Sequence, residues 1–345
     1  MIRLCCALVA LVAAGWTGSP DRACAQAGDA SYELTVGAFA APGSPWAQQW
    51  QAFKRNVEGQ TDSRVAVKLL TGGEAGGEAA AMTYVRRNRL QVGGFTLSGT
   101  ASVVPELDIL LSPFFYDSRE QVDFIMDEYL FETFQALFAE KNLELLQWVE
   151  VGWLHMYGKR PVLTPDDMAN KRMRIQASRA AETLAASLDA EMVQMKFGDL
   201  IPSLQTGLVF GGETNMVLYG VTGLANEASH LTLTRHAYDT GTVVANLEWM
   251  RSLPDPLAEA VRSGFPPSDQ ARAQVRAVAK ALLGKVQADG ATIHRLSPDQ
   301  RQRWLAATDD NADVLIERIG GRAREIYARM VEGRARWRAM HGGGS

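Results

Sequence analysis

Hydrophobic residues form three successive patterns along the chain, and the first is a short unbroken run at the N-terminus. About 13 apolar residues, 4–16, follow Arg3, and Ala23, Cys24 and Ala25 then supply the small residues typical of a signal-peptide cleavage site. The run is too short to cross a bilayer, which needs about 20 residues. We therefore expect residues 1–25 to be a cleaved secretory signal peptide. A lipid-modified N-terminus at Cys24 is the alternative.

The second pattern alternates strand-like segments with amphipathic helices. Residues 32–39 alternate with the period of a strand, and Ser44 with Pro45 is typical of a helix start. Four apolar residues then recur at the spacing of one helix face: Trp46, Trp50, Phe53 and Val57. A strand, a loop, a helix and a strand are predicted next, at residues 64–70, 72–77, 78–89 and 92–97. This order is typical of a parallel sheet covered by helices.

The same alternation returns after a long helical stretch at residues 118–140. Strands are predicted near residues 143–149 and 155–161. Five further segments follow: a strand at 172–176, a helix at 177–188, a strand at 192–195, a helix at 198–206 and a strand at 208–211. We therefore predict an α/β protein with two lobes, mainly residues 26–150 and mainly residues 151–250.

The third pattern is helical and fills the C-terminal part of the chain. Long helices are predicted over residues 256–288 and 309–338, and the second has many arginines on one face. We interpret that face as solvated, with an interaction surface as the alternative. Residues 251–341 are expected to pack as helices across both lobes, and the glycine-rich residues 342–345 to form a flexible tail.

Charge and cysteine content narrow the class of protein. The 345 residues include 35 Lys and Arg against 39 Asp and Glu, a net charge of −4, so no large cationic field points to nucleic acid. All three cysteines lie in the first 24 residues, so the mature chain has no thiol nucleophile or thiolate ligand. Removing residues 1–25 takes away a net +1 and leaves −5. No later segment reaches about 18 consecutive apolar residues, so stable membrane insertion is not expected.

The sequence lacks the motifs that common enzyme chemistries need. Its five histidines never form a zinc spacing, and no Gly-x-Ser-x-Gly occurs. The glycine-rich residues 72–77 lack the Lys and Ser or Thr of a phosphate-binding loop. The start of a calcium loop at Asp309 fails because Val314 stands where glycine must turn the chain. We predict no metal, no cofactor and no catalysis, and favour an exported receptor that binds its ligand between two lobes.

Short motifs in a fixed order give the chain a resemblance to a known family. They lie at residues 42–46, 72–78, 104–107, 112–115, 159–162, 164–168, 172–175, 203–207, 249 and 253–254. The chain resembles the extracytoplasmic solute-binding proteins of tripartite ATP-independent periplasmic (TRAP) transporters, of the C4-dicarboxylate-binding, DctP-like type. The resemblance implies a type II-like periplasmic-binding-protein fold. In that fold each lobe is a mixed sheet flanked by helices, and a long helix connects the lobes.

The resemblance also implies a function and a ligand anchor. Members bind a small organic anion between the lobes in the periplasm and deliver it to TRAP membrane subunits. The arginine of their Arg-x-Arg-Ile strand forms a two-pronged salt bridge to the ligand carboxylate, and Arg174 has that position. A guanidinium suits this role because it is always charged and matches both oxygens. Phe197 matches an aromatic residue that packs on the ligand. Without the resemblance, Arg174 would pair with a protein acid and Phe197 would belong to the core.

One departure from the family pattern concerns the second carboxylate. Leu154 stands where many members have another carboxylate-binding arginine. Either the ligand has one carboxylate held by Arg174 alone, or His155 or Lys159 supplies the second donor. Trp153, next to this position, is expected to form a wall of the site.

Other candidates lie on both lobes. Residues 209–216 replace the family's Asp-Gly-x-Glu-Asn-Pro, with Phe210 at the Asp, Thr214 at the ligand-binding Asn and Asn215 at the Pro. Thr214 or Asn215 can still form a hydrogen bond with a ligand oxygen. Glu78 and Ser98 occupy loop ends that face the cleft in the family, and a capping or solvated role explains them equally well.

Two other functions and two assembly states stay open. The altered positions would also suit a periplasmic enzyme on the same scaffold, which turnover of bound ligand would reveal. A ligand sensor for a signalling partner is the third possibility. The protein is expected to be a monomer or a dimer joined through its C-terminal helices.

Overall fold

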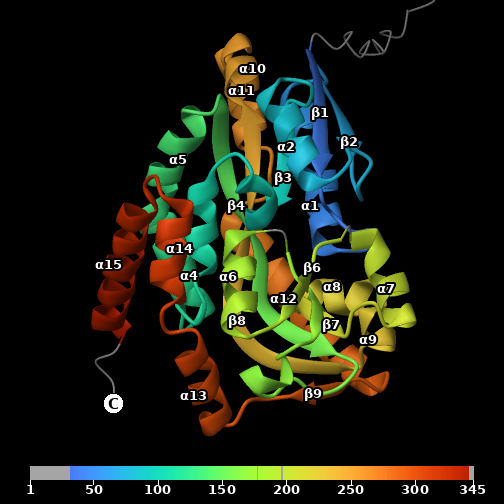
Figure 1. Ribbon diagram of the computed structural model, residues 1–345. Coiled ribbons are helices and arrows are strands. Elements are labelled where there is room, and N and C mark those ends of the chain that lie inside the picture. The colour runs from blue at the N-terminus through green and yellow to red at the C-terminus, as the bar shows by residue number, and fades with distance from the viewer. Residues whose placement is uncertain (1–31, 177, 196, 342–345) are drawn as a thin grey trace, which may run out of the picture.

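One mixed β-sheet runs through both halves of the molecule and is covered by helices (Figure 1). The computed structural model describes residues 32–176, 178–195 and 197–341, apart from the side chain of Phe197. The predicted signal peptide, residues 1–25, and the predicted tail, residues 342–345, lie outside this range. Within it the sheet has nine strands in the order β2-β1-β3-β8-β4-β7-β5-β6, and β9 pairs with β8.

The strands are β1 (Tyr32–Ala38), β2 (Val65–Leu70), β3 (Val92–Thr96), β4 (Leu143–Gly158), β5 (Arg172–Arg174), β6 (Glu191–Val193), β7 (Gly211–Asn215), β8 (His230–Asn246) and β9 (Thr292–His294). The α-helices up to β8 are α1 (Pro45–Gln60), α2 (Glu78–Arg86), α3 (Leu97–Thr100), α4 (Arg119–Phe124), α5 (Phe131–Ala139), α6 (Arg179–Ser187), α7 (Leu200–Thr206), α8 (Met216–Val221) and α9 (Leu224–Glu227). After β8 come α10 (Leu247–Ser252), α11 (Asp255–Arg262), α12 (Ser268–Ala288), α13 (Pro298–Ala307), α14 (Asn311–Ile319) and α15 (Ala323–His341). Short 3-10 helices cover Pro105–Leu111, Pro165–Asp167 and Phe197–Asp199, and a π-helical segment covers Ile125–Leu130.

Two long antiparallel strands, β4 and β8, connect the two halves. β3 pairs with one end of β8, with Val92 opposite Ala245, and β7 pairs with the other end of β4, with Leu154 opposite Asn215. The prediction of two separate strands at 143–149 and 155–161 is wrong, because β4 is continuous over 16 residues. Its register shifts at three bulges, one of them beside Gly152, whose φ of +104° suits glycine. The boundary expected at residue 150 therefore falls inside a strand.

Other differences follow from turns and long-range pairing. The 17-residue strand β8 was not predicted, and the strand expected at 208–211 begins only at Gly211. The helix expected over 256–288 breaks into α11 and α12, since Gly264, Pro266 and Pro267 separate them. The helix expected over 309–338 likewise divides at Gly320 and Gly321, both with positive φ.

Helix α1 was predicted well and fixes the position of β3. Ser44 caps it, with its Oγ accepting a hydrogen bond of 3.3 Å from the Ala47 N–H, and Pro45 is its first residue. The four apolar residues of its predicted face are buried. A Cβ at Gly94 of β3 would lie 2.3 Å from the ring of Trp50, so the helix packs this closely only because that residue is glycine.

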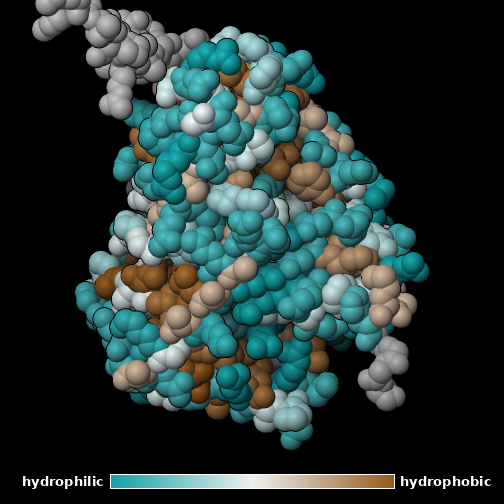
Figure 2. Space-filling view, turned by 180° about the vertical axis from the view of Figure 1, so that it is seen from behind, coloured by the Kyte–Doolittle hydropathy of each residue, from teal (hydrophilic) through white to brown (hydrophobic). Residues whose placement is uncertain are grey.

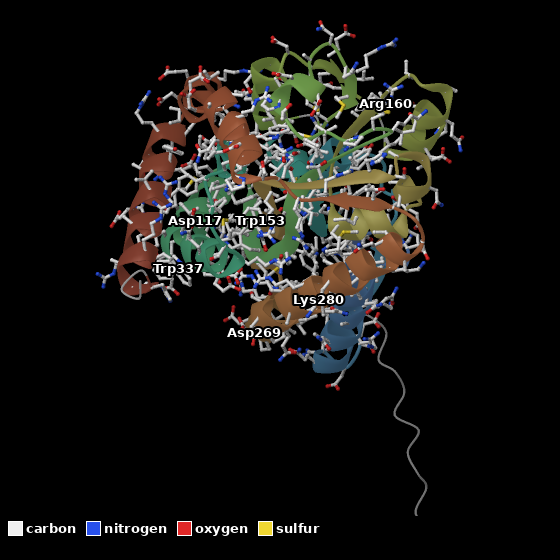
Figure 3. The ribbon with its side chains drawn as sticks, turned by 90° about the horizontal axis from the view of Figure 1, so that it is seen from below. Asp117, Trp153, Arg160, Asp269, Lys280 and Trp337 are labelled. Carbon is white, nitrogen blue, oxygen red and sulfur yellow. The ribbon has the colours of Figure 1, made fainter. Side chains whose placement is uncertain are left out.

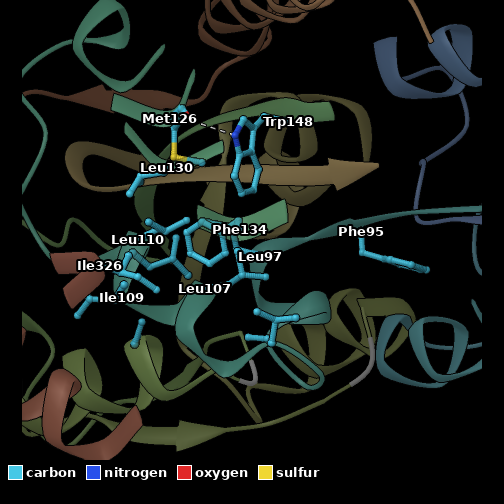
Figure 4. Packing of buried hydrophobic residues seen from close by; sticks show 14 of the residues in the cluster. Phe95, Leu97, Leu107, Ile109, Leu110, Met126, Leu130, Phe134, Trp148 and Ile326 are labelled. Atoms are coloured by element: carbon cyan, nitrogen blue, oxygen red, sulfur yellow. Dashed lines mark hydrogen bonds between the residues drawn. The ribbon is translucent and has the colours of Figure 1, made fainter. Parts of the chain in front are cut away.

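The largest hydrophobic cluster anchors β4 under the helices on the opposite side of the sheet. Phe134 of α5 packs edge-on against Trp148 with ring centroids 5.5 Å apart (Figure 4). Trp148 also donates a hydrogen bond of 3.2 Å from Nε1 to the Met126 carbonyl. The same cluster includes Ile326 of α15. Strand β4 is therefore held by the C-terminal helices as well as by the sheet.

The surface is mostly hydrophilic, and apolar side chains gather in the lower half of the rear view (Figure 2). Several arginines of the α14–α15 region form ion pairs within the protein, such as Arg322 with Glu325 at 2.7 Å and Arg338 with Asp117 at 2.8 Å. No helix in the described part of the chain is long and apolar enough to cross a membrane.

Candidate functional site

Polar side chains from both halves meet near the carboxyl ends of β3, β5 and β7. Thr96 ends β3, Arg174 ends β5 and Asn215 ends β7. Ligands of open α/β sheets bind outside this edge of the strands. Arg174 lies opposite Gly212 of β7, where a Cβ would stand 2.3 Å from the Arg174 carbonyl oxygen and 2.6 Å from Tyr157 Oη. Glycine at this position lets β5, β7 and β4 lie close together behind the arginine.

Glu78 is the acidic group that the N-terminal half brings to this edge. Its Oε1 accepts a hydrogen bond of 2.7 Å from the Thr96 N–H, and its Oε2 accepts one of 2.9 Å from Thr96 Oγ1. These bonds join the first turn of α2 to the end of β3. Burial raises the pKa of Glu78, although the bonds to Thr96 and the nearby charge of Arg174 oppose that rise.

Glu213 and His236 form a buried pair on the other side of Arg174. Glu213 Oε2 lies 2.8 Å from His236 Nε2, and both side chains are almost wholly buried. His236 Nδ1 lies 2.8 Å from Thr234 Oγ1, which fixes the ring. Burial alone would raise the pKa of Glu213, but the hydrogen bond and charge of His236 and the charge of Arg174 outweigh it and lower the pKa. Glu213 is therefore ionised at neutral pH.

Asp239 of β8 is a third carboxyl group in the same place. It is 1% exposed, and neither oxygen completes a hydrogen bond with any residue that the structure describes. Burial raises the pKa of Asp239 to about 8, and the negative charges of Glu78 and Glu213 add to the effect. The Gln176 amide and the Leu97 N–H approach the carboxyl group and oppose part of this shift.

Some of these groups line three hollows in the described structure. One between the halves is mostly apolar and includes Phe39, Trp46, Trp50, Phe95, Thr96 and Asn215. A second shares Phe39 and Phe95 with it and reaches Glu78. A third is lined by Leu154, Gln176, Glu213 and His236. Glu213 and His236 thus line one small, mostly apolar hollow, and Glu78 lines another.

The polar candidates predicted on β7 lie within the sheet. Asn215 borders the apolar hollow, but its Oδ1 accepts a hydrogen bond of 3.0 Å from the Leu218 N–H and so caps α8. Thr214 lies opposite His155 of β4 and is 4% exposed. Ser98 donates a hydrogen bond of 2.8 Å to Gln176 Oε1, which links the segment after β3 to the segment after β5.

The candidates around residue 154 belong to the core or the surface. Trp153 packs edge-on against Tyr238 with ring centroids 4.8 Å apart, and its label lies inside the outline of the molecule in Figure 3. His155 is buried, accepts a hydrogen bond of 3.3 Å from the Arg235 N–H, and has a pKa lowered to about 3 mainly by burial. It is therefore neutral and offers no positive charge. Lys159 is exposed after β4.

The side chain of Phe197 lies outside the described residues, so the predicted ligand contact stays a prediction. Residue 197 begins the short 3-10 helix Phe197–Asp199. No group of three or more His, Cys, Asp or Glu side chains suited to a metal ion occurs among the described residues.

Sequence reasoning missed Gln176, Glu213, His236 and Asp239 as members of the site. Glu213 lies within residues 209–216, the stretch compared with the family's Asp-Gly-x-Glu-Asn-Pro motif. Its place in that motif was the signal that could have identified it as a site residue. The other three come together only through the pairing of β5, β7 and β8 with their neighbours.

The fold and this cleft define a two-lobed protein of the solute-binding class. The model of the family described as bacterial extracellular solute-binding protein, family 7, matches residues 36–317, so the chain belongs to that family. The resemblance noted in the sequence is thereby confirmed. The family consists of solute-binding receptors of TRAP transporters rather than enzymes.

Relatives and solved structures agree with this assignment. A solute-binding protein of Chromohalobacter salexigens is 28% identical over 196 residues, 56% of this chain and 58% of that protein, which is less than two thirds of its length. The ectoine-binding periplasmic protein TeaA of Halomonas elongata is 25% identical over 290 residues, 80% of this chain and 82% of its own. A TRAP solute-binding protein of Roseobacter denitrificans with bound β-D-glucuronate aligns with a TM-score of 0.81 and 21% identity, covering 86% of this chain and 98% of its own.

Proposed function

We propose that the protein is a receptor that binds a small organic anion through one carboxylate in the cleft. The observation that carries this proposal is Arg174 at the end of β5, whose charge acts on Glu78 from one half and on Glu213 from the other. A ligand bonded to this guanidinium would contact both halves and so favour their closed arrangement. Leu154 is buried and borders the hollow beside Glu213, which supports one carboxylate anchor instead of two.

We further infer that the protein is exported with cleavage after Ala25 and delivers its ligand to TRAP-type membrane subunits. Membership of family 7 supports this role, as do relatives named for binding ectoine and a neighbouring structure with bound glucuronate. We expect no turnover, so a ligand incubated with the protein should be recovered intact.

Calorimetric titration with a library of carboxylates tests the proposal. Arg174→Gln should weaken binding of the best ligand at least about 30-fold, since truncating one partner of a buried charge pair costs about 2–5 kcal/mol. Arg172→Gln is the matched control, because Arg172 lies on the same strand with an exposed side chain. Equal affinities for wild type and Arg174→Gln would refute the anchor, and chemical conversion of the ligand would favour an enzyme.

A further inference from the structure

Asp239 is a buried carboxyl group that has no part in the proposed binding of a carboxylate by Arg174. It lies in the middle of β8 opposite Gly152 of β4, where the long strands connect the halves. A buried carboxyl group without completed hydrogen bonds costs free energy, and such groups persist where they serve a function. Its two oxygens have no completed bond in the described structure, so this buried carboxyl group has acceptor capacity that the protein itself does not use.

The surroundings of Asp239 are acidic. Glu78 of α2 and Glu213 of β7 both act on it, and Gln176 follows β5 beside it. Glu213 is matched by His236, and Arg174 is the positive group that acts on Glu78. When the carboxylate of a ligand binds the Arg174 guanidinium, it neutralises the positive charge of Arg174. The carboxyl groups of Glu78 and Asp239 then have no positive charge to balance them.

We propose that Asp239 and Glu78 form a subsite for a positively charged nitrogen of the ligand whose carboxylate binds Arg174. The inference rests on the proposed function and narrows it to zwitterionic carboxylates, which have one carboxylate and one cationic N–H group. A charge-assisted N–H···O bond to Asp239 would fill its open acceptor positions. The cationic nitrogen would at the same time compensate the charge of Glu78.

A dicarboxylate fits this arrangement poorly. Its second carboxylate would face Glu78 and Asp239, and like charges repel strongly where water is excluded. Leu154 offers no positive charge at the position of the second arginine, and His155 is neutral. A hydroxylated monocarboxylate can donate to Asp239 but leaves the charge of Glu78 uncompensated.

The subsite predicts proton release on binding. Asp239 is mostly protonated at pH 7, because its pKa is raised to about 8. The charged groups that act on it are Glu78 and Glu213; Arg174 acts on both of these carboxyl groups, and His236 pairs with Glu213. A cationic nitrogen favours the ionised carboxylate, so its binding should release a fraction of a proton and strengthen as the pH rises from 6 toward 8.

Calorimetry of the exported full chain with three probes tests the proposal: ectoine as a zwitterion, glucuronate as a hydroxylated monocarboxylate and succinate as a dicarboxylate. Each is titrated at pH 7 in two buffers with different ionisation enthalpies, which measures released protons. Ectoine should bind at least about 10-fold more tightly than either other probe and release protons. Asp239→Asn should weaken ectoine binding by a factor of ten or more and abolish the proton release. The surface variant Asp269→Asn, at the start of α12, is the matched control and should do neither.

Two outcomes overturn the proposal in different ways. If succinate or glucuronate binds as tightly as ectoine, or if Asp239→Asn leaves ectoine binding and proton release intact, the cationic subsite is wrong while the receptor function stands. If none of the three probes, nor any member of the carboxylate library, depends on Arg174, the proposed function itself fails. Circular dichroism of each variant separates loss of binding from loss of fold.

Discussion

Ser98 Oγ donates a hydrogen bond of 2.8 Å to Gln176 Oε1, and this bond spans the cleft between the segments after β3 and β5. Both residues lie beside the acidic group Asp239, since Gln176 and Leu97, the neighbour of Ser98, approach its carboxyl group. The bond therefore stabilises the arrangement in which the two halves face each other around Arg174.

Loss of that bond should weaken ligand binding modestly. Ser98→Ala removes one hydrogen bond worth about 0.5–1.5 kcal/mol from the closed arrangement, which corresponds to roughly 2- to 12-fold in affinity. Calorimetry with the best carboxylate measures the change. Ser102→Ala is the control, because Ser102 Oγ, as far as the structure describes the chain, bonds only to the Gly99 carbonyl in the same turn. Equal effects of the two variants would show that the bond to Gln176 contributes nothing to closure.

Breaking the Glu213–His236 pair should destabilise the fold strongly at neutral pH. Glu213→Gln removes the ionised partner of the 2.8 Å contact with His236, and the loss of a buried hydrogen bond to a charged group costs about 1.5–3 kcal/mol. The pKa of Glu213 in the folded protein lies below 4.5, so the stabilisation is present above that value and is lost as the pH falls through the lowered pKa. Urea unfolding should thus show a large deficit at pH 7 that shrinks in acid. A deficit that is independent of pH, or one as small as that of the exposed control Glu191→Gln, would contradict this account.

Removing the charge of Asp239 should stabilise the ligand-free protein. The folded pKa of about 8 exceeds the ordinary value of 3.8, so the folded state binds the extra proton and stability falls as the pH rises between these values. Asp239→Asn abolishes this loss. Its melting temperature should exceed that of wild type by several degrees at pH 8 and by much less at pH 5, as differential scanning fluorimetry would show. A lower melting temperature at pH 8 would mean that the ionised carboxylate has a partner in the free protein.

A cluster of four arginines should respond to salt. Arg235 lies near Arg119, Arg295 and Arg301, and none of the four has a carboxylate within salt-bridge distance in the described structure. Burial and these three charges lower the pKa of Arg235. Arg235→Gln should therefore raise the melting temperature slightly at low salt, and the gain should fade in about 1 M NaCl, where the Debye length is about 3 Å. The exposed Arg160, at the rim in Figure 3, provides the control variant Arg160→Gln. A gain of equal size in about 1 M NaCl would contradict the assignment of the effect to charge repulsion.

Local signals predicted the N-terminal half of the fold well. The start of α1 followed from Ser44 and Pro45, and its buried face followed from apolar residues at helical spacing. Both signals act within a few residues, so no distant contact alters them. The strand β8 was missed because all of its residues from His236 onward are buried, polar ones included. Alternation between apolar and polar positions therefore gives no guidance there.

The residues of the candidate site also fall into two groups, those that a local motif predicts and those that only long-range strand pairing brings together. Arg174 could be singled out from a motif on one short strand, whereas Glu213, His236 and Asp239 meet through pairing across β4, β7 and β8. Three bulges set that register, and a shift of one residue would turn Asp239 to the other face of the sheet. No pattern in the sequence fixes the bulges, so the acidic side of the cleft emerges only in three dimensions.

The central claim is that Arg174 anchors the carboxylate of a small ligand. Native mass spectrometry of the purified full chain, beside the Arg174→Gln variant prepared identically, tests it most directly. We predict a wild-type adduct whose mass corresponds to a small carboxylic acid and whose signal is absent from Arg174→Gln but retained in Arg172→Gln. The same adduct on Arg174→Gln at equal occupancy would contradict the claim.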